Sequence, residues 1–170
     1  MSGLFIGRLE IESGLGTLIE AVDLYPGARI AVIGAGPEQA RIAGHPRIRL
    51  LGPVGALEAQ DRMGKAGYLV LPSLSYEDVP RPLVEAFANG LPVIASRIGR
   101  LAEMVEPGRN GLLFEAGSAR DLARRLAWAD AFPEKMRQMG ECAKADYRAR
   151  FLANWGYQTL FGERRRAARV

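Results

Sequence analysis

Residue types that commonly perform nucleophilic or acid–base catalysis are scarce in this 170-residue chain, which contains one cysteine and one histidine. Cys142 has no partner for an internal disulfide, and it lies in a charged helical stretch far from any glycine-rich turn, which makes it a poor nucleophile. His45 lies in a His-Pro dipeptide and is interpreted as a surface loop residue. The sequence therefore offers no Ser-His-Asp or Cys-His arrangement.

The chain also lacks long apolar runs. None approaches the ~18 consecutive apolar residues that cross a bilayer, and the start at Met1 shows neither the charged nor the long apolar region of a signal peptide. Hydrophobic residues make up 48% and charged residues 25%, as is ordinary for a soluble globular domain. The length predicts one domain, and we expect it to be cytoplasmic.

The net charge of +4 is unevenly distributed, with −2 on residues 1–85 and +6 on residues 86–170. The net charge equals that of four arginines near the C-terminus, which are Arg164, Arg165, Arg166 and Arg169. We interpret them as a solvated helix end and expect no nucleic-acid partner. A weaker alternative is a peripheral contact with the inner face of a membrane, made by this tail together with four apolar residues. Those residues are Phe151, Trp155, Leu160 and Phe161.

Short apolar runs bounded by Gly, Pro or Ser alternate with helical patterns, which is typical of βαβ units. The predicted strands are Leu4–Gly7, Arg29–Gly34, Ile48–Leu51, Tyr68–Leu71, Pro92–Ser96 and Gly111–Phe114. Helices are predicted from Leu15, from Pro37 and over Ala56–Ala66, Pro82–Asn89, Arg100–Val105 and Ala119–Ala129. From Pro133 onward only amphipathic helix is expected, with a break near 154–156.

Right-handed crossovers between these strands predict an α/β fold: a doubly wound, Rossmann-like parallel sheet in the order 3-2-1-4-5-6, with helices on both faces. Residues 1–130 would form this βαβ core and residues 131–170 the C-terminal helices of a single domain. Such sheets bind ligands beyond the carboxyl ends of the strands where the order reverses, here after strands one and four. This places the site at Gly7-Arg8 and at the loop of residues 72–77.

Two groups of residues at this switch point could bind an anionic, hydroxyl-bearing ligand. The Arg8 guanidinium could bind a phosphate, or it could form a surface ion pair. Glu77 follows strand four, and Glu85 lies in the next helix, where it could accept hydrogen bonds from sugar hydroxyls or serve as a capping residue. Pro82 suits the start of that helix, whose amino end attracts anions.

The turn after strand two contains half of a dinucleotide-binding fingerprint. Gly34 and Gly36 match its first two glycines, but Gln39 stands where the third should be, and no acidic residue ends the next strand. We therefore prefer a close strand-to-helix turn to a nicotinamide site.

Five segments together resemble a known family. They are FIGRLEIESGLGTLIEAV (5–22), VIGAGPE (32–38), IRLLGPV (48–54), YLVLPSLSYEDVPRPLVEAFANGLPVIAS (68–96) and GRLAEMVEPGRNGLLFE (99–115). In this order they resemble the C-terminal, nucleotide-sugar donor-binding half of a retaining glycosyltransferase of family 4, which has the GT-B fold. The resemblance extends from about Leu4 to Leu126. Its most specific part is the pair of glutamates eight positions apart, Glu77 and Glu85.

The resemblance implies a role for each matching residue. Arg8 would bind the donor diphosphate, Glu77 would contact the transferred sugar, and Glu85 would hold the ribose hydroxyls. Arg8 and Glu77 would thus be the catalytic residues, with positive charge stabilising the leaving diphosphate and no nucleophilic carboxylate pair. Val54 would lie beside the base. The remaining residues assigned to the donor site are Gly7, Val79, Pro80 and Arg81.

Three positions depart from the family pattern. Ser13 stands where a lysine usually grips the diphosphate, Asp78 adds negative charge near the leaving group, and Pro82 removes an N–H from the expected phosphate cradle. Together these departures predict weakened or altered donor binding. A second hypothesis is therefore a degenerate donor domain without catalytic activity that serves as a binding or scaffold module.

Substrates and partners also follow from the resemblance. It implies a UDP- or GDP-sugar donor and transfer of a hexose in polysaccharide or glycolipid biosynthesis. No metal is expected, since the sequence has no Asp-x-Asp motif. The N-terminal acceptor domain of a GT-B enzyme is absent from these 170 residues, so we expect a partner domain or chain to supply it, and the chain alone to be incomplete for catalysis. Self-association is predicted if the apolar face of the last helix is exposed.

Overall fold

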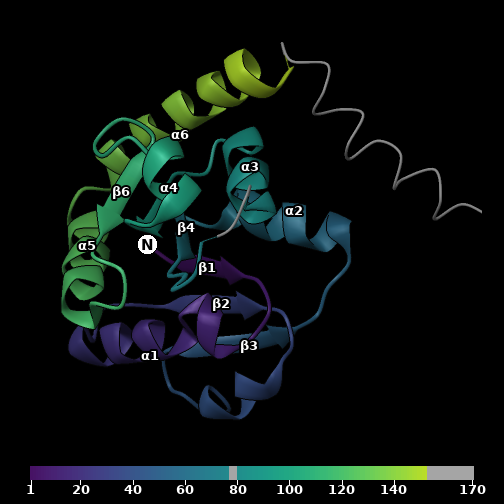
Figure 1. Cartoon of the computed structure of the whole chain (residues 1–170), viewed down its shortest axis with the longest axis vertical. Helices are drawn as coiled ribbons and strands as arrows, with labels where there is room; N and C mark the ends of the chain where they lie inside the picture. The colour runs from purple at the N-terminus through teal and green to yellow at the C-terminus, as the bar shows by residue number, and fades with distance from the viewer. Residues whose placement is uncertain (77–79, 153–170) are drawn as a thin grey trace, which may run out of the picture.

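Six parallel strands form one open sheet in the computed structural model, which describes residues 1–76 and 80–152 (Figure 1). The strands lie in the order β3-β2-β1-β4-β5-β6, which confirms the predicted doubly wound topology. Their bounds are Gly3–Ile6 (β1), Ile30–Ile33 (β2), Ile48–Gly52 (β3), Tyr68–Leu71 (β4), Val93–Ser96 (β5) and Gly111–Phe114 (β6).

The strands from β4 to β6 consist mostly of apolar residues because both faces of the sheet are covered. Every residue of β4, β5 and β6 is buried. Strand β1 pairs with β2 on one side and with β4 on the other, where Gly3 lies opposite Ile30 and Tyr68. The order of the strands therefore reverses between β1 and β4, as the sequence predicts.

Two layers of helices enclose the sheet (Figure 1). The helices are Leu15–Leu24 (α1), Ala56–Lys65 (α2), Arg81–Ala88 (α3), Gly99–Met104 (α4), Ala119–Ala131 (α5) and Pro133–Tyr147 (α6). One core cluster joins α1 and α5 to the sheet through Leu18 and Leu126, among others. A second cluster joins α2, α3 and α4 through Met63, Leu83 and Leu101. Helices thus cover both faces, as predicted.

The helix predicted from Pro37 is shorter than a regular α-helix. It is a five-residue 3-10 helix, Pro37–Arg41. Ile42 is the one buried residue between Pro37 and Arg47, so this stretch has no apolar face that could stabilise a longer helix. The connection from β2 to β3 is consequently mostly loop.

Helix α6 crosses from one face of the sheet to the other. Met136 packs in the first core cluster, whereas Ala143 packs in the second. The crossing brings α6 close to the turn after α3, where a Cβ on Gly140 would lie 2.2 Å from the carbonyl oxygen of Gly90. Only glycine fits this approach.

The C-terminal helices continue beyond α6 as a short π-helix, Arg148–Leu152. The ring of Phe151 stacks on Tyr147 with 5.9 Å between centroids. Phe151 therefore contacts the preceding turn of the same helical stretch. The expected break near 154–156, the residues Trp155, Leu160 and Phe161, and the arginine tail lie outside the described residues.

Within residues 1–76 and 80–152, no helix combines the length and the apolar character required to span a membrane.

Candidate functional site

The loops that follow β1 and β4 are fastened to one another at the carboxyl edge of the sheet. The backbone N–H of Leu74 donates to the carbonyl oxygen of Glu12 at 2.8 Å. Gly14 has φ 76°, and a Cβ there would lie 1.8 Å from the carbonyl oxygen of Pro72. Glycine is therefore required both by its backbone conformation and by the close approach of the two loops. This contact brings together the two loops that the sequence predicts for the site.

The β1 loop is braced on its other side by the turn after β2. A Cβ on Gly34 would lie 1.8 Å from the carbonyl oxygen of Gly7, and Gly34 has φ 141°. The N–H of Leu9 donates to the carbonyl oxygen of Ala35 at 3.0 Å. Gly34 thus permits close packing of two backbone segments, as expected for a tight strand-to-helix turn. The turn holds the loop that carries Gly7 and Arg8.

Arg8 projects from this braced loop with 81% of its side chain exposed. Its Nε lies 3.2 Å from Oε2 of Glu10. This surface ion pair is one of the two alternatives that the sequence leaves open. An exposed pair of this kind is weak, so it does not prevent the guanidinium from binding a phosphate.

Ser13, at the position where the resemblance implies a lysine, stabilises the β1 loop. Its Oγ donates to the carbonyl oxygen of Glu10 at 2.6 Å and accepts from the N–H of Glu10 at 3.3 Å. The serine hydroxyl thereby closes the short 3-10 turn Ile11–Ser13. Its contribution is to loop geometry, and it adds no charge.

Helix α3 carries the second part of the site. Arg81 is its first residue, one position before the predicted start at Pro82, and no described side chain caps the helix. Nε of Arg81 donates to Oε1 of Glu85 at 2.7 Å, with 64% of the arginine and 36% of the glutamate side chain exposed. The interpretation of Glu85 as a capping residue is wrong, because Glu85 lies in the second turn and pairs with Arg81.

The structure places the other predicted residues as follows. Pro80 is buried and precedes α3. Val54 follows β3, is half-buried, and packs against the core cluster that also contains residues of α3. Glu77, Asp78 and Val79 lie outside the described residues.

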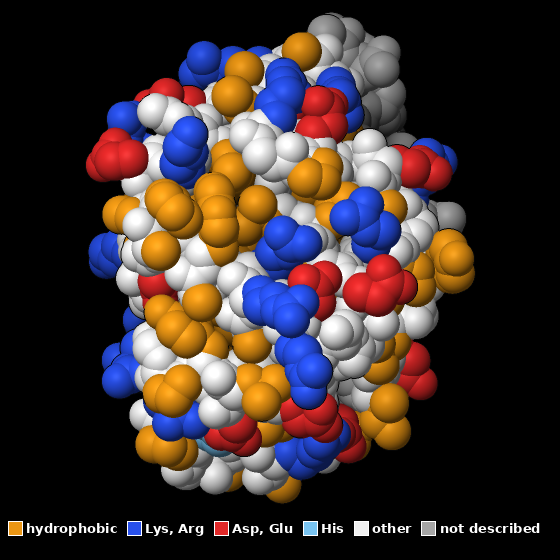
Figure 2. Space-filling model, turned by 90° about the vertical axis from the view of Figure 1, so that its left-hand side faces the viewer, with side chains coloured by type: hydrophobic (Ala, Val, Ile, Leu, Met, Phe, Trp, Pro, Cys, Tyr) orange, Lys and Arg blue, Asp and Glu red, His pale blue; other side chains and the backbone are white. Residues whose placement is uncertain are grey.

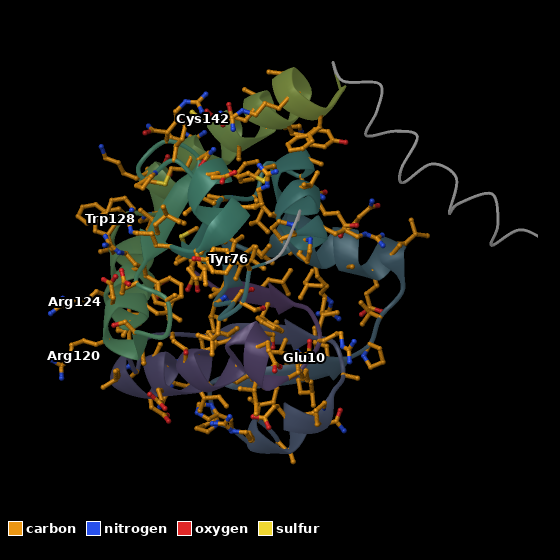
Figure 3. All side chains as sticks on the ribbon, viewed as in Figure 1. Glu10, Tyr76, Arg120, Arg124, Trp128 and Cys142 are labelled. Atoms are coloured by element: carbon orange, nitrogen blue, oxygen red, sulfur yellow. The ribbon has the colours of Figure 1, made fainter. Side chains whose placement is uncertain are left out.

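The β4 loop adds side chains whose exposure the sequence does not reveal. Tyr76 is 81% exposed, and a Cβ on Gly99 would lie 2.8 Å from its Cδ1. Figure 3 labels this tyrosine above the β1 loop residue Glu10. Leu74, in the same loop, is 41% exposed.

Two arginines at the end of β5 are further candidates that sequence reasoning missed. Arg97 is exposed and forms no ion pair with the residues that the structure describes. Arg100, in α4, pairs with Glu103 at 2.8 Å. The sequence shows that both arginines follow a predicted strand. They belong to no recurring motif, however, so nothing in the sequence singled them out. No group of three metal-binding side chains occurs in the described part of the chain.

The outer side of α5 lies away from the β1 and β4 loops. Figure 2 shows basic side chains interspersed with hydrophobic ones on the face that includes α5. In Figure 3, Arg120, Arg124 and Trp128 follow one another along this helix, far from Glu10 and Tyr76. These arginines therefore do not contribute to the candidate site.

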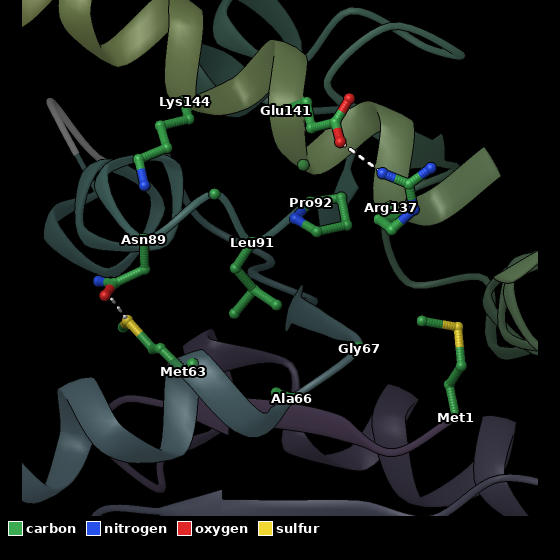
Figure 4. A pocket seen from close by; sticks show the side chains of 13 residues that line it. Met1, Met63, Ala66, Gly67, Asn89, Leu91, Pro92, Arg137, Glu141 and Lys144 are labelled. Atoms are coloured by element: carbon green, nitrogen blue, oxygen red, sulfur yellow. Dashed lines mark hydrogen bonds and ion pairs between the residues drawn. The ribbon is translucent and has the colours of Figure 1, made fainter. Parts of the chain in front are cut away.

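A hollow of about 340 Å³ lies at the opposite, amino edge of the sheet (Figure 4). Its floor includes Met63, Leu91 and Pro92, and Arg137, Glu141 and Lys144 of α6 border it. Gly67 and Pro92 immediately precede β4 and β5. The hollow is therefore separated from the switch-point loops by the length of the strands, and we do not assign the ligand to it.

With this geometry established, comparison with known proteins identifies the family. Residues 2–129 match the family described as glycosyl transferases group 1. The chain belongs to this family. An uncharacterized glycosyltransferase of Methanocaldococcus jannaschii is 34% identical over 148 residues, covering 84% of this chain and 42% of that protein.

Two further relatives extend the comparison. A lipopolysaccharide core biosynthesis glycosyltransferase of Rhizobium meliloti is 28% identical, covering 96% of this chain and 45% of the relative. The crystal structure of Anabaena HepE in complex with UDP-glucose superimposes with a TM-score of 0.80 and 25% identity, over 88% of this chain and 44% of HepE. The group 1 chain described here thus spans less than half the length of each of these proteins.

Proposed function

We propose that this group 1 glycosyltransferase chain is the nucleotide-sugar binding half of a retaining enzyme of family 4 that transfers a hexose in polysaccharide or glycolipid biosynthesis. The observation that supports the proposal is the fastening of the β1 and β4 loops at the switch point, which holds the loop that carries Arg8 against the loop that follows β4. The UDP-glucose bound by HepE and the lipopolysaccharide pathway of the Rhizobium relative support the donor and product classes.

In the proposed reaction, the bond between the anomeric carbon and the diphosphate breaks, and its electron pair leaves with the diphosphate. An acceptor hydroxyl oxygen bonds to the same carbon on the same face, and its proton passes to the leaving phosphate oxygen. Arg8 would stabilise the charge that develops on the diphosphate. Glu77 would contact the transferred sugar, and Glu85 would accept hydrogen bonds from the ribose. Residue side chains supply this charge stabilisation, and we propose no metal.

The acceptor would bind to a separate domain or partner chain in this proposal, because the homology concerns less than half of each relative. Catalysis by the 170 residues alone is therefore not expected. We place the enzyme in the cytoplasm, at the inner face of a membrane where the acceptor is lipid-linked, and retain self-association through the last helix as a prediction.

Calorimetry with UDP, GDP and ADP and their glucose conjugates tests donor binding directly. We expect heat from at least one nucleotide, and loss of about tenfold in affinity for it in Arg8→Ala, because a charge-assisted phosphate contact is removed. Arg120→Ala, on the outer side of α5, serves as the charge-matched control and should bind as the unmodified protein does. No heat from any nucleotide, or equal affinity in Arg8→Ala, would reject the proposal.

The alternative is a non-catalytic donor-domain module. The observation that favours it is Ser13, whose hydroxyl closes the β1 turn where the family pattern has a diphosphate-binding lysine. A module of this kind would keep the fold and bind nucleotide weakly or not at all.

A further inference from the structure

Arg81 occupies a position that the stability of α3 does not explain. It is the first residue of the helix, where the positive end of the helix dipole repels a cation. Its ion pair with Glu85 places the cation before the anion, which is the less favourable order at this spacing. On α2, Glu58 precedes Arg62 and Asp61 precedes Lys65, in the favourable order, whereas Arg137 precedes Glu141 on α6. Arg81 combines the less favourable order with the first position of its helix, so a contribution to the stability of α3 does not account for it.

The backbone at this end of α3 offers few free donors. Pro82 has no N–H, and the N–H groups of Leu83 and Val84 donate to the carbonyl oxygen of Pro80 at 3.0 and 3.4 Å. The Arg81 guanidinium, in contrast, carries five N–H donors on a largely exposed side chain. Most of the capacity to bind an anion at the start of α3 therefore resides in this side chain.

The ion pair between Arg81 and Glu85 is easily exchanged. Both side chains are more than one third exposed, and exposed pairs of this spacing are weak in water. A diphosphate carries more charge than one carboxylate and can accept two parallel hydrogen bonds from a guanidinium. Release of Glu85 from Arg81 leaves a carboxylate that accepts hydrogen bonds from hydroxyl groups.

We propose that Arg81 exchanges Glu85 for the diphosphate of the bound nucleotide, while the released Glu85 accepts hydrogen bonds from the ribose. The inference rests on the proposed function and adds a second diphosphate-binding cation to the site, supplied by α3. The ion pair then serves as a resting arrangement of two side chains that bind separate parts of one ligand.

Parallel titrations with UDP and uridine separate this role from a merely structural one, because uridine has the ribose but no phosphate. Arg81→Gln should weaken UDP binding about tenfold and leave uridine binding within about twofold. Arg81→Lys should recover part of the affinity for UDP. Lysine keeps the positive charge but lacks the planar guanidinium that can donate two parallel hydrogen bonds. Glu85→Gln should weaken the binding of both ligands.

Arg137→Gln is the matched control. Arg137 on α6 pairs with Glu141 at the same spacing and in the same order, and it also pairs with Glu134. The Arg137 side chain is 60% exposed, close to the 64% of Arg81, and it lies at the opposite edge of the sheet. The Arg137→Gln variant should bind UDP and uridine with the affinities of the unmodified chain. UDP is measured by calorimetry and uridine by NMR titration, and thermal unfolding verifies that each variant is folded.

The outcomes distinguish the inference from the proposed function. If the unmodified chain binds UDP but Arg81→Gln binds it equally well, or loses UDP and uridine to the same extent, the exchange is wrong and the donor site stands. If the unmodified chain binds neither UDP, GDP nor ADP, both proposals fail.

Discussion

The guanidinium of Arg109 grips the carboxylate of Asp146 with two parallel hydrogen bonds, from Nη1 to Oδ2 at 2.6 Å and from Nη2 to Oδ1 at 2.7 Å. Asn110 adds a third bond, from Nδ2 to Oδ2 at 2.9 Å. Asp146 is buried near the end of α6, and its partners precede β6. This contact fixes the end of α6 to the sheet.

The Arg109–Asp146 contact predicts a specific pH dependence. Burial alone raises the pKa of Asp146, but the hydrogen bonds from Arg109 and Asn110 and the charge of Arg109 outweigh it, so the pKa lies below its usual range. The stabilisation is therefore present above the unfolded-state pKa, about 3.9, and is lost as the pH falls through the lower folded-state pKa. Asp146→Asn should lower the free energy of unfolding at pH 7 by about 2 kcal/mol.

Urea unfolding at pH 7 and at pH 3 measures the difference between Asp146→Asn and the unmodified chain, which should shrink at the lower pH. Asp61→Asn is the control, because Asp61 forms an exposed i,i+4 pair with Lys65. It should change the free energy of unfolding by less than about 0.5 kcal/mol. A difference for Asp146→Asn that is the same at both pH values would contradict the assignment.

Replacement of Gly14 should disturb the fold and the site together. In Gly14→Ala, the positive φ would be strained and the new Cβ would collide with the carbonyl oxygen of Pro72. Gly44 has nearly the same φ, 75°, but among the described residues no atom lies within 4 Å of a Cβ there. Gly44→Ala should therefore cost only the backbone strain, about 1 kcal/mol, and Gly14→Ala at least about 2 kcal/mol more.

The two glycine variants are compared by chemical denaturation and by nucleotide titration. Gly14→Ala should also weaken UDP binding, because the loop that carries Arg8 must shift away from the β4 loop. Gly44→Ala should leave binding unchanged. Equal losses of stability in the two variants would show that the β1 and β4 loops can move apart without a measurable loss of free energy.

Removal of the carboxylate beside Arg8 should strengthen nucleotide binding. Glu10 pairs with Arg8 at 3.2 Å, so a diphosphate must compete with it. Glu10→Gln should tighten UDP binding by about two- to fivefold, the range of a weak exposed ion pair, and the gain should diminish in 0.5 M salt. Glu12→Gln removes a nearby charge that is not paired with Arg8, and it should have the smaller effect. Equal effects of the two substitutions would show that Glu10 acts only through the overall negative charge of the loop and does not compete with the diphosphate for Arg8.

The fold and the meeting of the β1 and β4 loops were predictable from local patterns, whereas contacts between side chains far apart in the sequence were not. Uninterrupted apolar runs such as Tyr68–Leu71 mark strands of a parallel sheet, and the handedness of crossovers orders them. Asp146 and its partner Arg109 lie 37 positions apart in the sequence, and no short motif predicts a contact over that separation. The contact of Tyr76 with Gly99 is likewise a property of the packed loops.

Ser13→Lys tests whether the chain retains a functional donor site or a degenerate one. The substitution adds a cation near Arg8 but removes the two hydrogen bonds that Ser13 makes with the backbone of Glu10. Ser13→Ala removes the same bonds without adding charge, and each variant should lose about 1 kcal/mol of stability. If the remaining site is intact, Ser13→Lys should bind UDP about tenfold more tightly than Ser13→Ala. Equal affinities, measured by calorimetry on folded protein, would favour the non-catalytic module, because an added cation can strengthen diphosphate binding only where a diphosphate site exists.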